Sequence, residues 1–150
     1  MGTKIFFAKE AKPAYLYKQS AAIPFFIENG ITMVVLITNK KRTKWLFPKG
    51  FIEYNTTPEE SAANEAIEEA GVDGHIHDQC IAEYSYEKWR GVCSVKVFPL
   101  FVTELFDTWE EMGERDRLVV EIPEAIELVR IEQRDALKTF GTLDKSEFLP

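Results

Sequence analysis

A predicted helix near the middle of the chain constrains the fold most, because the sequence marks both of its ends. Thr57 suits the N-cap, Pro58 suits the first helical position, and Glu60 stands three residues after Thr57, as in a capping box. Gly71 is a natural C-terminal stop. The sequence therefore predicts a helix over residues 58–70, with several alanines that let it lie close against a sheet.

Three glutamates on this helix form the first candidate site. Glu65, Glu68 and Glu69 stand at positions i, i+3 and i+4, so their carboxylates share one helical face. Like charges at this spacing repel, and no basic partner stands at helical spacing from them. Converging carboxylates suit hard cations such as Mg²⁺ or Mn²⁺. The alternative is a solvated acidic face, which many surface helices have.

Short apolar and β-branched runs around this helix indicate strands, and the end of the chain indicates helix. The expected strands are residues 20–28, 31–38, 45–47, 82–86, 92–104 and 118–122, followed by helical residues 123–140 with a break near Ile131. Pro99 interrupts the longest run, which predicts a sheet edge or a bulge. The prediction is an α/β (α+β) fold with a mixed sheet between helices, in one domain over residues 1–150 with an N-terminal arm over 1–18.

Composition restricts the class of protein. The 150 residues are 45% hydrophobic, which is enough for the core of one domain, and no apolar run approaches the roughly 20 residues that span a bilayer. The N-terminus lacks the pattern of a secretion signal. Cys80 and Cys93 lie in apolar stretches, so we expect two buried thiols in a reducing cytoplasm. The net charge of −7 argues against a nucleic acid polymer as partner.

A basic cluster precedes the helix. It consists of Lys40, Lys41, Arg42, Lys44 and Lys49. Basic residues concentrated in an acidic protein suggest a small, highly charged anion, although a solvated loop is the alternative. Because Gly50 and Glu53 follow directly, one stretch brings together cations for phosphates, a glycine turn and a carboxylate cage, which are the parts that hydrolysis of a phosphate–phosphate bond needs.

The stretch from Gly50 to Val72, GFIEYNTTPEESAANEAIEEAGV, resembles the Nudix box, in which glycine, glutamate, arginine and a glutamate cluster are separated by fixed intervals. The resemblance implies an α/β/α sandwich and metal binding by the residues matching Glu65, Glu68 and Glu69. It also implies that the main-chain carbonyl at Gly50 or its neighbour joins the metal. For the mechanism we expect a metal-activated water to attack one phosphorus, with Glu68 and Glu69 as the ligand pair, Glu65 as metal ligand or proton acceptor, and Glu53 as a second candidate for handling the proton.

Two positions depart from the box. Thr56 stands where the family has its first glutamate, and Asn64 stands where it has arginine. In the family these two side chains pair and brace the loop against the helix. We expect Thr56 and Asn64 to share a hydrogen bond in place of that pair, because replacing both charged residues leaves no charge without a partner.

The segment WLFPKGFIE, residues 45–53, is similar to a variant of the box found in diadenosine polyphosphate hydrolases and diphosphoinositol polyphosphate phosphohydrolases. This likeness implies polyphosphate contacts near Lys18, Arg42 and Lys44, to which the basic cluster adds Lys49. Glu110, Glu111 and Glu114 in a later loop are further candidates for proton handling, or a solvated acidic turn.

The expected function is metal-dependent hydrolysis of a nucleoside polyphosphate, a dinucleoside polyphosphate or a diphosphoinositol polyphosphate, with Mg²⁺ or Mn²⁺ as cofactor and a small molecule as partner. The alternative is a catalytically weak or inactive module of the same fold that binds a phosphorylated ligand or a protein. The sequence leaves open whether the chain forms a homodimer.

Overall fold

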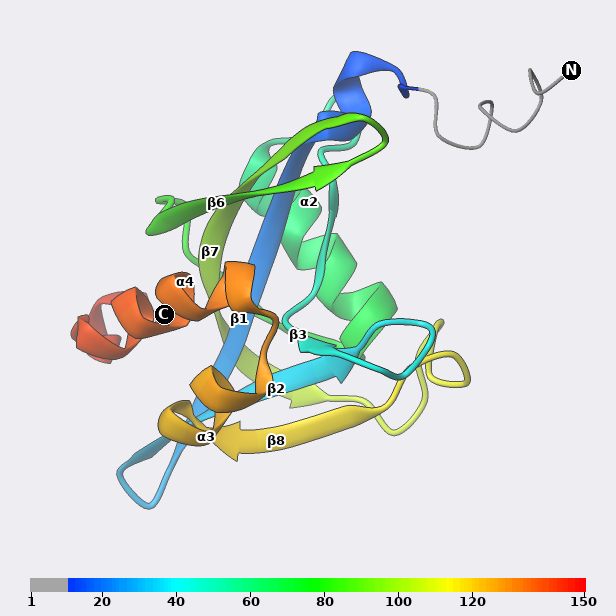
Figure 1. The fold of residues 1–150 in the computed structure, drawn as a ribbon. Helices are drawn as coiled ribbons and strands as arrows, with labels where there is room; N and C mark the ends of the chain where they lie inside the picture. The colour runs from blue at the N-terminus through cyan, green and yellow to red at the C-terminus, as the bar shows by residue number, and fades with distance from the viewer. Residues whose placement is uncertain (1–10) are drawn as a thin grey trace, which may run out of the picture.

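The computed structural model describes residues 11–150 and contains a mixed sheet of eight strands with helices on both faces (Figure 1). The strands are β1 (Lys18–Glu28), β2 (Ile31–Thr38), β3 (Trp45–Leu46), β4 (Lys49–Phe51), β5 (Val72–Ile76), β6 (Ala82–Lys88), β7 (Gly91–Leu105) and β8 (Arg117–Glu121). The helices are α2 (Pro58–Glu65), continued by a π-helical turn (Ala66–Ala70), α3 (Ile122–Leu128), α4 (Ile131–Thr142) and two short 3₁₀ helices (Ala14–Tyr17 and Lys145–Phe148). No helix among these residues is long and apolar enough to cross a membrane.

The strand order of the sheet is β3-β2-β1-β7-β5. In addition, β4 and β6 pair with β1 and β7 respectively, and β8 pairs with β2. The central pair β1–β7 is parallel and the other pairs are antiparallel, which makes the sheet mixed. The predicted fold class is therefore confirmed.

The central strand β1 shows how the sheet is buried on both faces. Ala21, Ile23 and Phe25 belong to the core that includes α3 and α4, whereas Ala22 belongs to the core formed with the alanines of α2. Successive side chains of a strand point to opposite faces, so this alternation places α2 on one side and α3 and α4 on the other. Figure 1 shows the same three layers.

The main elements lie close to their predicted positions. The break between the last two helices falls at Val129 and Arg130, next to the expected Ile131. The strands β4 and β5 were not predicted, because β4 has three residues and β5 contains Asp73 and Gly74, where its register with β7 shifts. Of the predicted N-terminal arm, residues 1–10 lie outside the described part, and the remainder is a 3₁₀ helix leading into β1.

Pro99 lies inside the sheet, so the prediction of a sheet edge or a bulge at this residue was wrong. β7 pairs with β6 up to Val97 and with β5 from Leu100 onward, and Pro99 stands between these two partners. Proline lacks an N–H, and at this changeover its carbonyl accepts a hydrogen bond from the His77 N–H at 2.9 Å. The strand therefore continues through Pro99 because its partner changes there.

The two cysteines differ in burial. Cys93 is fully buried on β7, as predicted. Cys80 is exposed in the turn between β5 and β6, where its thiol donates to the carbonyl of Ala82 at 3.1 Å, so the prediction of a second buried thiol was wrong. The strand β6 begins only at Ala82, so the cysteine precedes it.

Candidate functional site

The acidic helix, α2 with its π-helical turn, has the predicted ends. The Thr57 side chain accepts a hydrogen bond from the Glu60 N–H at 3.2 Å, and Pro58 occupies the first turn. Gly71 ends the helix with φ of 64°, in the left-handed region. The helix therefore extends over the predicted residues, and its last turn, which carries Glu68 and Glu69, is π-helical.

Glu65 is buried against the β4 backbone. Only 9% of its surface is exposed, and a Cβ at Gly50 would overlap its carboxylate. Burial raises the pKa of Glu65 to about 8, and repulsion from Glu69 and Glu68 adds to the shift. Gly50 is thus required by the position of this carboxylate, which is a more specific reason than the turn expected from the sequence.

Glu69 is also buried, and both of its carboxylate oxygens have partners. One accepts a hydrogen bond from the Lys49 N–H at 3.1 Å, and the other pairs with the Arg115 guanidinium at 3.0 Å. Burial raises the pKa of Glu69 to about 7, while Arg115 opposes that shift. Arg115 also donates to the carboxylate of Glu111 at 2.8 Å and to the carbonyl of Thr38 at 3.0 Å.

Glu68 faces the loop between β7 and β8. Three carboxylate oxygens lie within 4.8 Å of one another, one each from Glu68, Glu110 and Glu111. Burial, followed by repulsion from Glu110 and Glu53, raises the pKa of Glu68. The structure therefore groups Glu68 with two loop glutamates, whereas the sequence grouped it with Glu65 and Glu69. Both sets border the same helical turn.

The donors fit the divalent cation that the family resemblance implies. All are carboxylate oxygens, the ligands that hard cations prefer, and burial raises the pKa values of Glu65 and Glu69 because it disfavours their charged forms. Ser20 is paired with Gly50 across β1 and β4, so it faces α2, and its buried hydroxyl lacks a hydrogen-bond partner among residues 11–150. A cation on this face would relieve the repulsion between the carboxylates.

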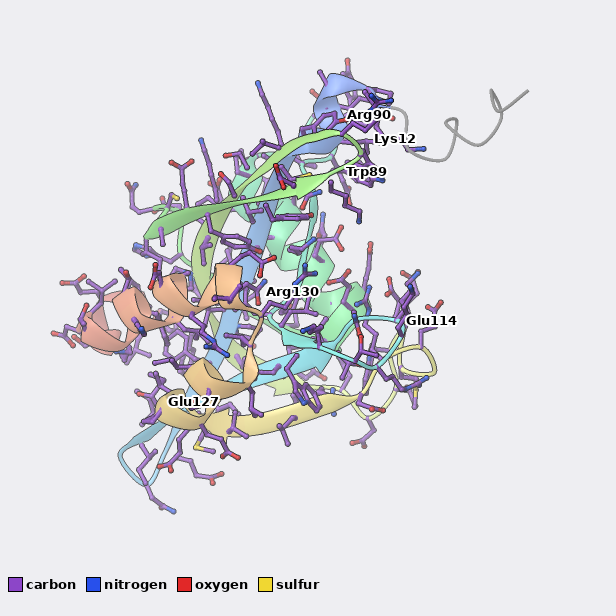
Figure 2. The ribbon with its side chains drawn as sticks, in the orientation of Figure 1. Lys12, Trp89, Arg90, Glu114, Glu127 and Arg130 are labelled. Atoms are coloured by element: carbon purple, nitrogen blue, oxygen red, sulfur yellow. The ribbon has the colours of Figure 1, made fainter. Side chains whose placement is uncertain are left out.

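A cationic cavity of about 300 Å³ adjoins Glu69. Five basic side chains line it, together with Asn39, Leu46 and Glu69: Lys40, Lys49, Lys88, Arg115 and Arg130. Figure 2 shows Arg130 just before α4, at the centre of the molecule. Such a cavity suits several phosphate groups, and Glu69 joins it to the acidic helix.

Lys49 is held at the base of the cavity by a polar network. Its ammonium donates to the Tyr86 hydroxyl at 2.8 Å and to Gln19 Oε1 at 3.3 Å, and lies 4.7 Å from the centroid of the Tyr86 ring. Burial lowers the pKa of Lys49 to about 8, and Lys88 adds to this effect by repulsion. Lys49 is therefore a buried basic group beside the acidic helix, and the charge of Glu69 partly opposes the shift of its pKa.

The four residues predicted to bind phosphate lie in different places. Lys49 lines the cationic cavity. Arg42 pairs with Asp116 at 3.2 Å, Lys44 lines a separate cavity beside α4, and Lys18 is exposed at the start of β1. Sequence reasoning missed Lys88, Arg115 and Arg130, because they come from the end of β6 and from two loops, far apart in the chain. The only local signal was that Arg130 directly precedes a helix.

The expected hydrogen bond between Thr56 and Asn64 is not formed. Within residues 11–150, the Thr56 hydroxyl instead donates to the Glu53 carbonyl at 2.7 Å and lies 2.6 Å from the Ser61 hydroxyl. Ser61 in turn accepts a hydrogen bond from the Glu53 N–H at 3.0 Å. Ser61, one turn earlier on the helix than Asn64, supplies the polar group that braces the loop.

Comparisons with known proteins identify the family of the chain. Residues 17–147 match the NUDIX domain family. The chain is 38% identical over 111 residues to Nudix hydrolase 21, chloroplastic, of Arabidopsis thaliana, covering 71% of this chain and 56% of the relative. It is 28% identical over 99 residues to diphosphoinositol polyphosphate phosphohydrolase 3-alpha of Mus musculus, covering 66% and 59%. The chain thus spans little more than half the length of these relatives.

A solved structure of similar fold is an Ap4A hydrolase from C. elegans, with a TM-score of 0.67 and 21% identity. The match covers 83% of this chain and 95% of that chain. At this identity the likeness supports the sandwich fold alone. The family match over most of the chain decides the assignment, and the chain belongs to the Nudix family.

Proposed function

We propose that the chain hydrolyses a phosphate–phosphate bond in a small polyphosphate with the help of Mg²⁺ or Mn²⁺. The observation that carries the proposal is the position of Glu69, which belongs both to the acidic helix and to the lining of the cationic cavity. This arrangement sets a cation-binding face beside an anion-binding cavity. The substrate class is a nucleoside polyphosphate, a dinucleoside polyphosphate or a diphosphoinositol polyphosphate.

The side chains divide into two groups by role. Glu65, Glu68 and Glu69 would hold the metal together with the Gly50 carbonyl, and Glu110 and Glu111 lie close enough to Glu68 to contribute. When bound, the metal neutralises phosphate oxyanions and lowers the pKa of an attacking water.

In the cationic cavity, Lys49, Lys88 and Arg130 would bind the phosphates and stabilise the leaving group. Glu65 or Glu53 would accept the proton of the attacking water, and repulsion from Glu53 already acts on Glu65.

A binding module without turnover is the second candidate. It is favoured by one observation, the ion pair that already neutralises Glu69, since Arg115 takes one carboxylate oxygen of a proposed metal ligand. Such a protein would bind a polyphosphate in the cationic cavity and release no phosphate.

Both candidates are tested by one assay. Purified protein is incubated with nucleotide, dinucleotide and inositol polyphosphates, with Mg²⁺ or Mn²⁺, and released phosphate and thermal shift are measured. Hydrolysis supports the enzyme, whereas a ligand-dependent thermal shift without hydrolysis supports the binding module.

Glu69→Gln keeps the shape and removes the charge, so we expect turnover to be lost with folding retained. Glu60→Gln, on an exposed position of the same helix, is the matched control. Normal hydrolysis by Glu69→Gln would disprove the metal-site assignment.

A further inference from the structure

The carboxyl end of the acidic helix is covered by the segment 106–117, which consists of the loop between β7 and β8 and the first residue of β8. Four successive carbonyls at a helix end, here Glu68 to Gly71, have no partner within the helix. In this structure each of the four accepts a hydrogen bond from the segment. The donors are Glu111 N–H to Glu68 at 3.1 Å, Trp109 Nε1 to Glu69 at 3.1 Å, Arg117 to Ala70 at 3.0 Å, and Phe106 N–H to Gly71 at 2.8 Å.

Arg117 is the centre of this cover. Its guanidinium donates to the carbonyls of Ala70 and Phe106 at 3.0 and 2.9 Å, and to that of Gly71 at 3.4 Å. It also lies 4.0 Å from the centroid of the Trp109 ring, a stacking distance at which cation and ring attract. One side chain thus joins the helix end to both ends of the segment.

Trp109 occupies the space beside Gly71. Its indole fills the position that a Cβ on Gly71 would need, and its N–H reaches the Glu69 carbonyl. A larger residue at 71 would displace the indole. Because Gly71 has no side chain, it can adopt its left-handed φ and also leave room for the Trp109 indole.

This cover addresses an electrostatic problem of the helix. The carboxyl end of a helix carries partial negative charge, so Glu68 and Glu69 lie at its least favourable end. A guanidinium on the carbonyls of this turn offsets that charge, while its hydrogen bonds fix the turn from which both side chains extend. The same segment supplies Glu110 and Glu111 to the acidic group around Glu68.

We infer that Arg117 and Trp109 are positioning residues, which fix the last turn of the acidic helix so that Glu68 and Glu69 can bind a divalent cation together. The inference rests on the proposed metal site and concerns no direct contact between either residue and substrate. We expect metal affinity to fall when the positive charge of Arg117 is removed, because its guanidinium fixes the backbone that carries the ligands.

The test measures Mn²⁺ binding by calorimetry, with thermal stability measured in parallel. Outer residues that orient metal ligands typically change affinity 10- to 100-fold, so we expect Arg117→Gln to weaken Mn²⁺ binding by about tenfold or more. Trp109→Phe keeps the ring and removes the N–H, and we expect a smaller loss. Arg134→Gln is the matched control, because Arg134 also donates to carbonyls at a helix end, those of Val129 and Glu127 at 3.3 Å, far along the chain from the acidic helix.

The outcomes are distinct. Weaker Mn²⁺ binding in Arg117→Gln and unchanged binding in Arg134→Gln would support the inference. Equal affinity in Arg117→Gln and the wild type, or an equal loss in Arg134→Gln, would overturn it. If Arg117→Gln does not fold, the affinity of Trp109→Phe decides, and wild-type affinity there overturns the inference. A wild type that binds Mn²⁺ but hydrolyses nothing would contradict the proposed function alone. A wild type that binds no Mn²⁺ would contradict both the proposed function and the inference about Arg117 and Trp109.

Discussion

The backbone of Gly50 lies against the carboxylate of Glu65, so closely that a methyl group at position 50 would overlap it. Glu65 extends from the acidic helix to β4, and Gly50 leaves the room in which its carboxylate lies. The glycine and the glutamate therefore act as one unit, although 15 positions separate them in the sequence. This relationship gives the glycine of the box a physical reason in this chain.

Gly50→Ala should impair activity much more than stability. The overlapping atoms are at the far end of a flexible side chain, so Glu65 can turn away, and we expect a stability loss of about 1 kcal/mol, at the low end for overpacking. A displacement of about 1 Å at a reacting site can cost on the order of 100-fold in rate, and we expect turnover to fall by about that factor. Thermal unfolding and turnover are measured on the same preparation.

Gly113→Ala is the control for this substitution, because a Cβ at Gly113 meets nothing within 4 Å. We expect this variant to behave like the wild type in both assays. Full turnover in Gly50→Ala would show that the position of Glu65 is not needed for the reaction.

Lys49→Met should raise KM for a polyphosphate by about tenfold or more, because a hydrogen bond to a charged group is worth about 1.5–3 kcal/mol. Lys44→Met is the matched control, since Lys44 lines the separate cavity beside α4, and we expect its KM within about twofold of the wild type. Burial lowers the pKa of Lys49 to about 8, so its contribution should decrease as the pH rises above 8. Equal effects of the two substitutions would locate the phosphates elsewhere.

The elements that could be predicted from the sequence are those with local signals. The capping box at Thr57 and the stop at Gly71 define the acidic helix within fifteen residues, and the β-branched run of β2 identifies a buried strand. The candidate ligands Glu65, Glu68 and Glu69 follow from helical spacing and from the family resemblance in the same way.

What could not be predicted depends on contacts between distant segments. Arg115 pairs with Glu69 across 46 positions, and no spacing rule connects a loop arginine to a helix glutamate. Within the helix no basic residue stands at helical spacing from the glutamates. Helical spacing, however, gives no information about the loop that packs over the helix and carries Arg115. The same holds for Lys88 and Arg130, which meet Lys49 only when the sheet and α4 are assembled.

The hydrogen bonds among Thr56, Ser61 and Glu53 should act as a unit. Thr56→Val and Ser61→Ala each remove one hydroxyl from the 2.6 Å contact, and we expect each to lower stability by about 1 kcal/mol. Because the two groups share their partners, the double variant should lose less than the sum. Urea denaturation of the four proteins measures this, and strictly additive losses would show that the two hydroxyls act independently.

The metal-free protein should lose stability as the pH rises from about 4.5 to 8. In the folded state the pKa of Glu65 is about 8 and that of Glu69 about 7, whereas both carboxyls have an ordinary value of 4.5. Between these values the folded protein holds protons that the unfolded chain has released, so each rise in pH favours unfolding. The stabilisation is complete below pH 4.5 and is lost as the pH passes through the folded pKa values.

The measurement is the unfolding temperature in EDTA at pH 5, 6, 7 and 8. A loss of 1 kcal/mol lowers Tm by about 2–4 °C in a chain of this length, so we expect a fall of several degrees across the series. Lys49 acts in the opposite direction above pH 8, where its folded pKa lies below its ordinary value, and the series therefore ends there. The double variant Glu65→Gln, Glu69→Gln cannot release these protons, so its Tm should change less with pH. A wild-type Tm that stays constant or rises from pH 5 to 8 would show that the two carboxyls are ionised throughout, and that their burial does not oppose the charges a metal would need.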